Sequence, residues 1–274
     1  GDAVLQHVYE RALASRWFLP ADAGRDSDPF ELLRAGRIDA AVIPPPGGLT
    51  RAIARGERPL GYKIGFTNRG IWDRYGVHHP IWGPVWDSTV TLLEDTEHRV
   101  SLAGLSQPRV EPEVVFGFAR APRAGMTLPQ LADCLEWVAH GFEIVHTHFE
   151  GWRFAAPDCL ADFALHGRLF VGPRVPVARF ADLALDTANL TVTLHRDGQP
   201  VETGHASIVL DGPLNALRLW VDGMAEHTPG WPIRAADLVT TGTITDAWPM
   251  SAGQRWHTTL SGPRLHGLTL ATVG

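Results

Sequence analysis

Two glutamates separated by a single residue stand out in the segment 109–118. The segment is rich in Val and Phe, with apolar residues at alternate positions, which predicts a β-strand. Because successive side chains of a strand point to opposite faces, Glu111 and Glu113 share one face. Neighbouring carboxylates on a partly buried face repel each other unless protons or a cation intervene, and Mg²⁺ prefers carboxylate oxygens. The pair therefore predicts a divalent-metal site, with a simple solvent-facing pair as the alternative.

A third carboxylate follows in the short apolar segment 141–145. Burying a lone ionised glutamate is costly, so Glu143 requires a cation or a hydrogen-bond donor. The three glutamates would supply three oxygen ligands and leave octahedral positions for water and substrate. Three nearby histidines, His140, His146 and His148, raise the alternative of a zinc site. We favour the carboxylate site, because alternation places His146 and His148 on the strand face opposite Glu143.

Lys63 is the only lysine in the chain, and every other basic side chain is arginine, histidine aside. It lies in the apolar, glycine-bounded segment 61–66. A lysine ammonium is compact and changes its pKa readily when buried, and ionisable groups in apolar surroundings mark functional sites. We therefore predict a role for Lys63 in proton transfer. A solvent-facing strand lysine is the alternative.

Histidines and arginines supply further candidate groups. Histidine titrates near neutral pH and can accept a proton from water. The candidates for this role are His166, His78 and His79, and for His166 a satisfied core position is the alternative. Arginine binds carboxylates through two parallel hydrogen bonds, so it can hold a second carboxylate of a substrate. The candidates for that role are Arg69, Arg74 and Arg153.

Short strands dominate the elements that must position these groups. Strands are predicted at 60–66, 89–93, 98–102, 109–119, 141–145, 168–172, 190–196, 200–204 and 237–243, with two more over 254–272. Asp197-Gly198 predicts a hairpin turn. Helical spacing predicts helices over 128–140, 157–164 and 213–226, the last with Pro213 near its first turn. Many strands with few helices between them indicate an α+β chain dominated by mixed sheet.

The N-terminal part differs from the rest. Residues 3–18 have helical spacing, and shorter helical pieces are predicted at 29–36 and 48–56. We therefore predict a small helical cap over 1–58 and a catalytic domain over 59–274.

Composition excludes several classes of protein. The 274 residues carry a formal net charge of −6 and no basic tract, so nucleic acid is not an expected partner. No apolar run is long enough to span a membrane, and the N-terminus lacks a signal-peptide pattern. The two cysteines, Cys134 and Cys159, have no zinc or redox spacing. We expect a cytoplasmic protein without a membrane partner.

Five motifs occur in an order that resembles the fumarylacetoacetate hydrolase superfamily. They are Gly61–Thr67 (GYKIGFT), Glu111-Pro112-Glu113, Phe142–Val145 (FEIV), Gly212–Leu217 (GPLNAL) and Thr241-Gly242-Thr243. The closer resemblance is to the branch that contains 2-oxopent-4-enoate hydratases and 4-oxalocrotonate decarboxylases. It covers the chain from about residue 60 to the C-terminus.

The resemblance implies a β-roll of mixed sheet flanked by helices. It also implies one Mg²⁺ or Mn²⁺ per subunit and a homodimer or larger homo-oligomer. By position, the metal ligands match Glu111, Glu113 and Glu143, and the active-site lysine matches Lys63. An acidic residue near the active site matches Asp87. The strand end that helps to hold the substrate carboxylate matches Thr241, Gly242 and Thr243.

The implied activity is metal-dependent chemistry on a 2-oxo acid through a metal-stabilised enolate, in aromatic-compound catabolism. We favour hydration of a 2-keto-4-pentenoate-type substrate by a hydro-lyase. The alternatives are decarboxylation of a 4-oxalocrotonate-type 2-oxo-alkenedioate by a carboxy-lyase, and C–C hydrolysis of an acylpyruvate or fumarylacetoacetate. A catalytically silent carboxylate-binding homologue is the non-enzyme alternative. It draws support from 163–166, where Phe-Ala-Leu-His replaces the Asn-Ala-Ser usual in the hydratases and leaves His166 to take over part of the serine's role.

Overall fold

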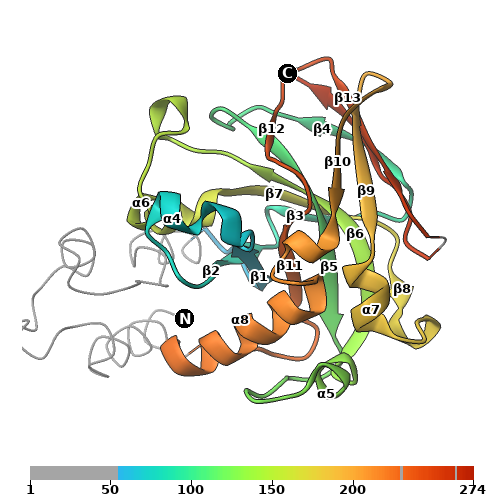
Figure 1. The fold of residues 1–274 in the computed structure, drawn as a ribbon. Coiled ribbons are helices and arrows are strands. Elements are labelled where there is room, and N and C mark those ends of the chain that lie inside the picture. Colours follow the sequence, from blue (N-terminus) through green and yellow to red (C-terminus); the bar gives the residue numbers. More distant parts are fainter. Residues whose placement is uncertain (1–54, 229–230, 263) are drawn as a thin grey trace, which may run out of the picture.

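Two mixed β-sheets form the body of the protein in a computed structural model that describes residues 55–228, 231–262 and 264–274 (Figure 1). The fold is α+β, as the sequence predicts. The predicted cap over 1–58, with its helices at 3–18, 29–36 and 48–56, lies outside the described residues except for its last four positions.

The larger sheet has nine strands. In spatial order they are β2 (Ile81–Trp86), β1 (Pro59–Gly65), β11 (Leu238–Thr243), β5 (Arg109–Phe118), β6 (Leu135–Val145), β7 (His166–Val171) and β3 (Val90–Leu92), with β12 (Trp248–Pro249) beside β5 and β8 (Val175–Pro176) beside β6. β1 runs parallel to β11, and β3 runs parallel to β7. The other pairings in this sheet are antiparallel, so the sheet is mixed. In the spatial order of the strands, β5 and β6 lie near its centre.

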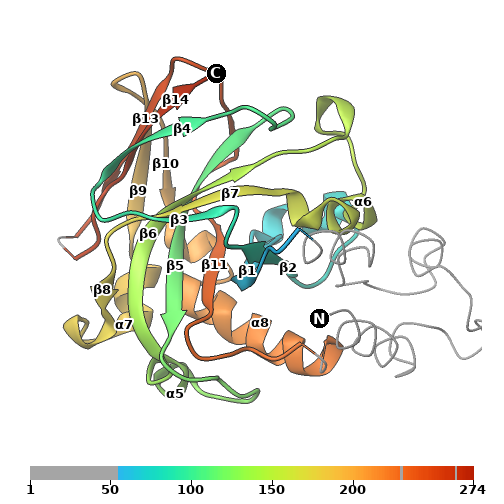
Figure 2. The ribbon, with the colours of Figure 1, turned by 180° about the vertical axis from the view of Figure 1, so that it is seen from behind.

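The smaller sheet has five strands and lies toward the C-terminal end of the molecule (Figure 2). Its strands are, in order, β10 (Gln199–His205), β9 (Thr191–Arg196), β13 (Arg255–Leu260), β14 (Thr269–Val273) and β4 (Glu97–Ser101).

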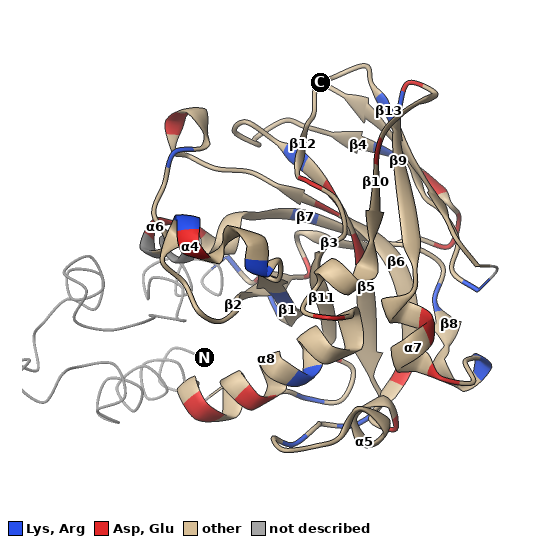
Figure 3. Cartoon of the chain, viewed as in Figure 1, with Lys and Arg blue, Asp and Glu red and all other residues tan. Residues whose placement is uncertain are grey.

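Short helices connect the strands. They are the α-helices α4 (Trp72–Tyr75), α5 (Leu128–Ala132), α6 (Ala156–Ala161), α7 (Leu183–Ala188) and α8 (Pro213–His227), and the 3₁₀ helices η1 (Arg69–Ile71), η2 (Glu150–Trp152), η3 (Phe163–Leu165), η4 (Val177–Arg179) and η5 (Ala206–Ile208). None of the helices in the described part of the chain is long and apolar enough to cross a membrane. Charged residues lie on helices, on loops and on several strands, and the central strands β5 and β6 carry Glu111, Glu113 and Glu143 (Figure 3).

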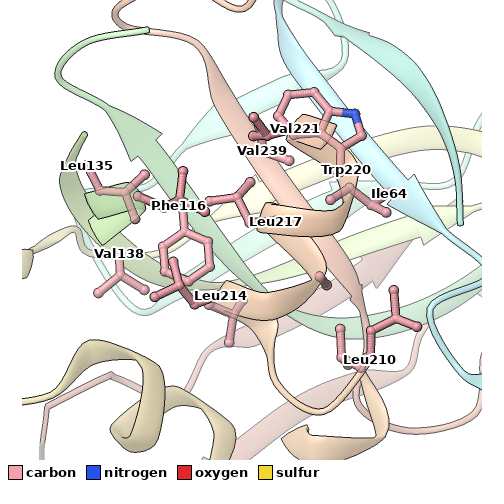
Figure 4. Packing of buried hydrophobic residues seen from close by; sticks show 14 of the residues in the cluster. Ile64, Phe116, Leu135, Val138, Leu210, Leu214, Leu217, Trp220, Val221 and Val239 are labelled. Atoms are coloured by element: carbon pink, nitrogen blue, oxygen red, sulfur yellow. The ribbon is translucent and has the colours of Figure 1, made fainter. Parts of the chain in front are cut away.

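The main core forms between α8 and the larger sheet. Leu214, Leu217 and Trp220 recur at helical spacing on α8 and are fully buried, and they face Phe116 of β5 and Ile64 of β1 (Figure 4). Burial of each such side chain contributes about 1.5–3 kcal/mol. The packing fixes β1 and β5, the two strands that carry Lys63 and two of the glutamates.

The predicted helix over 128–140 is wrong beyond its first turn and a half. α5 ends at Ala132, and β6 begins at Leu135 and pairs with β5 along its whole length. Leu131, Leu135 and Val138 fit a helical stripe, but Leu135 and Val138 pack from a strand into the main core. Pairing with a central strand outweighs the local helical pattern, because each residue of β6 gains a cross-strand neighbour.

The remaining predicted elements agree with the structure to within a few residues. The predicted helix over 157–164 is α6 followed by η3. In η3, Phe163, Ala164 and Leu165 all have positive φ angles (53°, 53° and 66°). Three consecutive left-handed residues without glycine are strained, so the surrounding structure must hold this turn in place.

Candidate metal centre and active-site cavity

The three predicted glutamate ligands converge. Glu111 of β5 lies directly opposite Glu143 of β6, and Glu113 lies opposite Gly141. Alternation along β5 places Glu111 and Glu113 on the same face. One carboxylate oxygen of each glutamate lies within 4.8 Å of the others. Glu113 and Glu143 are fully buried, and Glu111 is half-buried.

Strand β11 holds Glu113 in place. The Thr240 hydroxyl and the Gly242 backbone N–H (2.8 Å) both donate to Glu113 Oε2. Gly242 has a φ angle of +106°, and a Cβ atom there would lie 2.0 Å from Thr67 Oγ1, so only glycine fits. The second oxygen, Oε1, is buried and accepts no hydrogen bond within the described structure. One oxygen is therefore fixed by the protein while the other remains available.

Two cationic or ionisable side chains hold Glu143. Lys63 Nζ lies 3.2 Å from Oε2, and His166 Nδ1 lies 2.8 Å from Oε1. Lys63 also donates to the carbonyl of Ala164 in the strained turn, at 2.9 Å. Lys63 and Glu143 are both buried, so removing either partner would leave an uncompensated buried charge.

The pKa values of the three carboxyl groups are shifted in different directions. Burial raises the pKa of Glu111 to about 7, and Glu143 adds to the rise. Burial likewise raises the pKa of Glu113 well above its usual value, with Glu143 and Glu111 adding to it. Burial would also raise the pKa of Glu143, but Lys63 and His166 outweigh burial and lower it. The three groups cannot all ionise near neutral pH without a further positive charge.

A hard divalent cation fits this arrangement. Three carboxylates offer oxygen ligands, and the buried Glu113 Oε1 accepts no hydrogen bond from the described residues, while Glu143 Oε2 is contacted by Lys63. The zinc alternative has no comparable support. His140 contacts the Glu113 carbonyl and the Thr258 hydroxyl, and His148 contacts Asp162. Among the described residues, only the three glutamates form a group of possible ligands.

A cavity of about 640 Å³ opens onto the cluster. Lys63, Glu111 and Glu113 form part of its wall. Aromatic side chains form another part, with Tyr75 packed between Phe66 and Phe154 at ring-centroid distances of 5.0 and 5.8 Å. The cavity therefore combines a charged floor with apolar walls, as small-molecule sites do.

The other predicted site residues divide into two groups. Gly242, Thr243 and Arg74 line the cavity. Thr241, His166, Asp87, Arg69 and Arg153 do not.

Each of these outlying residues is engaged elsewhere or exposed. The Thr241 hydroxyl donates to the Val114 carbonyl at 2.9 Å. Asp87 pairs with Arg58 at 3.0 Å, and Arg69 pairs with Asp211 at 2.9 Å. Arg153 is exposed. The roles of these residues at the site remain predictions that the geometry does not favour.

His166 differs from the expected general base. It is buried, and its second nitrogen, Nε2, lies 2.8 Å from the Thr89 hydroxyl. Because both nitrogens are engaged, the ring orients Glu143 rather than facing the cavity.

Two residues at the site escaped the sequence analysis. Thr240 binds Glu113, and Arg109 lines the cavity with its guanidinium 4.0 Å from the ring centre of Trp152. Arg109 could have been found by extending the alternation of Glu113 and Glu111 by one step along β5. Thr240 could not, because only the pairing of β11 with β5 brings it to Glu113.

Comparison with known proteins finds a hydratase among the relatives of this chain. The 2-hydroxyhexa-2,4-dienoate hydratase of Comamonas testosteroni is 30% identical over 210 residues, which cover 76% of this chain and 77% of the relative. No family model matches the chain.

Two solved structures share the fold. One is the 4-oxalocrotonate decarboxylase of Pseudomonas putida G7 in complex with magnesium and adipate, with a TM-score of 0.76 and 22% identity over 99% of this chain and 96% of that one. The other is the fumarylpyruvate hydrolase of Pseudomonas aeruginosa in complex with Mn²⁺ and pyruvate, with a TM-score of 0.60 and 15% identity over 79% and 89%. With the hydratase relative, they confirm the predicted resemblance: the chain belongs to the fumarylacetoacetate hydrolase superfamily, in the branch of 2-keto-4-pentenoate hydratases and 4-oxalocrotonate decarboxylases.

Proposed function

We propose that the protein is a divalent-metal-dependent hydro-lyase that hydrates a 2-oxo-alkenoate of the 2-keto-4-pentenoate type. The observation that carries the proposal is the convergence of three glutamates, within 4.8 Å of one another, beside a buried lysine on one cavity. The 30% identical hydratase supports hydration as the reaction. The structures that contain Mg²⁺ and Mn²⁺ support a divalent ion as the cofactor.

Glu111, Glu113 and Glu143 would hold the ion. Once bound, it would polarise the 2-oxo group of the substrate and stabilise an enolate. The Lys63 ammonium contacts the Glu143 carboxylate and the Ala164 carbonyl, and Lys63 also lines the cavity. Its remaining N–H can donate to a substrate oxygen as negative charge develops there. In the metal-free protein burial lowers the pKa of Lys63, but the charges of Glu143, Glu111 and Glu113 outweigh burial and raise it.

The rest of the cavity serves binding. Gly242 and Thr243 line it at the end of β11, where they can contact a substrate carboxylate. The aromatic wall of Phe66, Tyr75 and Phe154 excludes water and strengthens the electrostatic interactions inside.

Decarboxylation of a 2-oxo-alkenedioate is the second candidate. It draws support from the whole-chain similarity in fold to the decarboxylase and from the additional cation, Arg109, in the cavity wall. Both reactions would use the same ion and the same lysine. They differ in whether water adds to the alkene of the substrate or its far carboxylate leaves as CO₂.

An ultraviolet assay with three substrates tests the proposal. 2-Hydroxypenta-2,4-dienoate, 4-oxalocrotonate and an acylpyruvate are each incubated with the protein in Mg²⁺ and, as control, in EDTA, and product masses are determined. We expect loss of the dienoate chromophore and a gain of one water only in Mg²⁺. Loss of CO₂ from 4-oxalocrotonate alone would establish decarboxylation instead. Turnover that persists unchanged in EDTA would exclude the metal-dependent mechanism.

A further inference from the structure

Building on the proposed function, we propose that the substrate is a 2-oxo-alkenoate with an aryl group at the end remote from its carboxylate, and that a row of aromatic side chains on the cavity wall binds this ring. The aromatic row consists of Phe66, Tyr75, Trp152 and Phe154, all of which line the cavity. Three features carry the inference: the size of the cavity, the exposed rings of the aromatic row and the two arginines that border it.

The first feature is size. The cavity has a volume of about 640 Å³. A 2-oxohexenoate, with about nine non-hydrogen atoms, would fill less than half of that volume even if each atom took the ~30 Å³ of a water molecule. Cavities of several hundred Å³ take drug-sized ligands. The space that the short acid leaves is therefore large enough for an additional ring.

The second feature is the aromatic row itself. Its ring centroids lie 5.0 Å apart from Phe66 to Tyr75, 5.8 Å from Tyr75 to Phe154 and 5.9 Å from Phe154 to Trp152. Phe66 and Phe154 pack against a small buried cluster that includes Cys159, which supports the row. Each ring of the row is half-buried, so part of its surface remains exposed. Covering this surface with an aromatic ligand is favourable, and such pairs gain more than apolar area alone provides.

The aromatic row lies beside the reacting groups. Phe66 follows Lys63 by three residues, directly after β1. At the other end of the row, Trp152 stacks on Arg109, which precedes Glu111 by two residues on the same face of β5. Two strand residues span about 7 Å, which is comparable with the length of a short carbon chain. A 2-oxo acid anchored at the glutamate cluster would therefore bring its remote end to the row.

The third feature is the pair of arginines at the row. The guanidinium of Arg74 lies 5.5 Å from the ring centre of Tyr75, and that of Arg109 lies 4.0 Å from the ring centre of Trp152. A guanidinium is planar and stacks on aromatic faces, so its second face can receive a further ring. A saturated ring has no π-system and gains no such contact. The wall should therefore prefer a phenyl group to a cyclohexyl group.

Binding measurements with three matched ligands test the inference. 2-Oxohexanoate, 2-oxo-6-cyclohexylhexanoate and 2-oxo-6-phenylhexanoate differ only in the group on the last carbon, and none carries an alkene to hydrate. Titration calorimetry with Mg²⁺ present gives the Kd of each for the wild type. We expect the phenyl acid to bind about 10–100-fold more tightly than 2-oxohexanoate, the range for burying one aromatic side chain. It should bind about 2–10-fold more tightly than the cyclohexyl acid.

Turnover tests the same selection. In 2-hydroxy-6-phenylhexa-2,4-dienoate a methylene separates the ring from the diene, so its hydration is chemically matched to that of 2-hydroxyhexa-2,4-dienoate. Binding of a remote group raises kcat/KM, and we expect the phenyl compound to have a kcat/KM at least about tenfold higher in Mg²⁺.

Four variants locate the effect. Tyr75→Leu and Phe154→Leu keep an apolar side chain without a ring, and each should lower the preference for the phenyl acid over the cyclohexyl acid. The double variant should abolish this preference. Phe180→Leu is the matched control, because Phe180 is also half-buried beside an arginine, Arg264, but does not line the cavity, and it should keep the whole preference. Circular dichroism and thermal melting check that each variant is folded.

Several outcomes overturn the inference alone. Equal affinities of the wild type for the phenyl acid and 2-oxohexanoate, each requiring Mg²⁺, would reject the remote ring while leaving the proposed function intact. A cyclohexyl acid that binds as tightly as the phenyl acid would reject the aryl group. Tight binding of the phenyl acid without Mg²⁺, while 2-oxohexanoate requires the ion, would place the ring outside the active site.

The remaining outcomes separate the site from the function. An unchanged preference in the double variant would reject the aromatic row as the binding site of the ring. If 2-oxohexanoate did not require Mg²⁺ for binding, the proposed function itself would fail. The wild-type comparison tests the selection of aryl acids even if a variant does not fold.

Discussion

The carboxylate cluster and the arginine wall of the same cavity are built in opposite ways. In the cluster, Glu113 and Glu143 are buried and tied to Thr240, Gly242, Lys63 and His166. In the arginine wall, formed by Arg74, Arg109 and Trp152, the cations stack on aromatic rings and have no acidic partner within the described residues. The cluster is held in place by its protein neighbours and keeps an oxygen for a cation, whereas the arginine wall keeps its charges available to a ligand.

We expect the carboxylate cluster to serve metal binding and catalysis, and the arginine wall to serve the choice of substrate. A metal site must hold its ligands within narrow limits, and hydrogen bonds from neighbouring strands supply that restraint. A region that distinguishes substrates must instead keep a charge unpaired until the ligand arrives. Substitutions in the cluster should therefore change metal binding and rate, while substitutions in the arginine wall should change which acid is bound.

Glu113→Gln would test the contrast most severely. The amide keeps the shape but loses the charge that a divalent ion requires, so we expect Mg²⁺-dependent kcat/KM to fall by at least about 10³-fold. Calorimetric titration of Mg²⁺ and substrate kinetics measure the two effects. Glu136→Gln, an exposed glutamate on β6, is the matched control. Unchanged activity in Glu113→Gln would remove the metal hypothesis.

Lys63→Met should have the next largest effect. Methionine keeps the length of the side chain but can neither donate a proton nor carry charge, so kcat should fall about 10²–10³-fold, within the range for a general acid or base. Binding of Mg²⁺ should persist, because all three carboxylates remain. A rate near that of the wild type would instead make Lys63 a structural partner of Glu143.

His166→Asn distinguishes a positioning role from a catalytic one. Because His166 contacts Glu143 and not the cavity, we expect Mg²⁺ affinity to fall about 10–100-fold while kcat at saturating Mg²⁺ stays close to wild type. His148→Asn, at an exposed histidine paired with Asp162, serves as control. A lower kcat that saturating Mg²⁺ does not restore would show that His166 acts on the substrate.

The pH dependence of metal binding gives the smallest effect. The pKa of Glu111 is raised to about 7, so this carboxyl holds a proton below that pH and must lose it to bind a cation. Affinity for Mg²⁺ should therefore fall as pH falls below 7, by up to about tenfold per pH unit from Glu111, and the raised pKa of Glu113 adds to the fall. In the metal-free protein the folded state binds the extra proton between pH 4.5 and 7, so stability should fall as pH rises through that window.

Two measurements check this pair of effects. Mg²⁺ titrations from pH 5.5 to 8 follow the affinity, and melting temperatures with EDTA follow the stability of the metal-free protein. An affinity that does not vary over the range would show that Glu111 is already ionised at pH 5.5.

The sequence predicts the parts of the site whose geometry is local. Glu111 and Glu113 share a face because they are two residues apart on one strand, and Lys63 stands out because it has no counterpart. Placement of Glu143 opposite Glu111 depends on strand pairing, which the motif order implied through the family. The fold class follows from the many short strands with few helices between them.

The sequence does not show which distant segments come into contact. The helix expected over 128–140 is largely the strand β6, because pairing with β5 decides its conformation. Asp87 matches the family by position, yet it pairs with Arg58 outside the cavity. The side chain of Thr240, rather than that of Thr241, reaches Glu113, since β11 can present only one of the two to that face.

The single lysine gives the protein an unusual analytical property. Lys63 carries the only ε-amino group of the chain, and it is buried in the wall of the cavity. Its ammonium form is favoured by the surrounding glutamates, so amine-directed reagents should modify it slowly and only from within the cavity. Reductive methylation with ¹³C-formaldehyde and a borohydride reductant would therefore convert one ε-amine to its ¹³C-dimethyl form, whose resonance is expected to respond to metal and substrate binding.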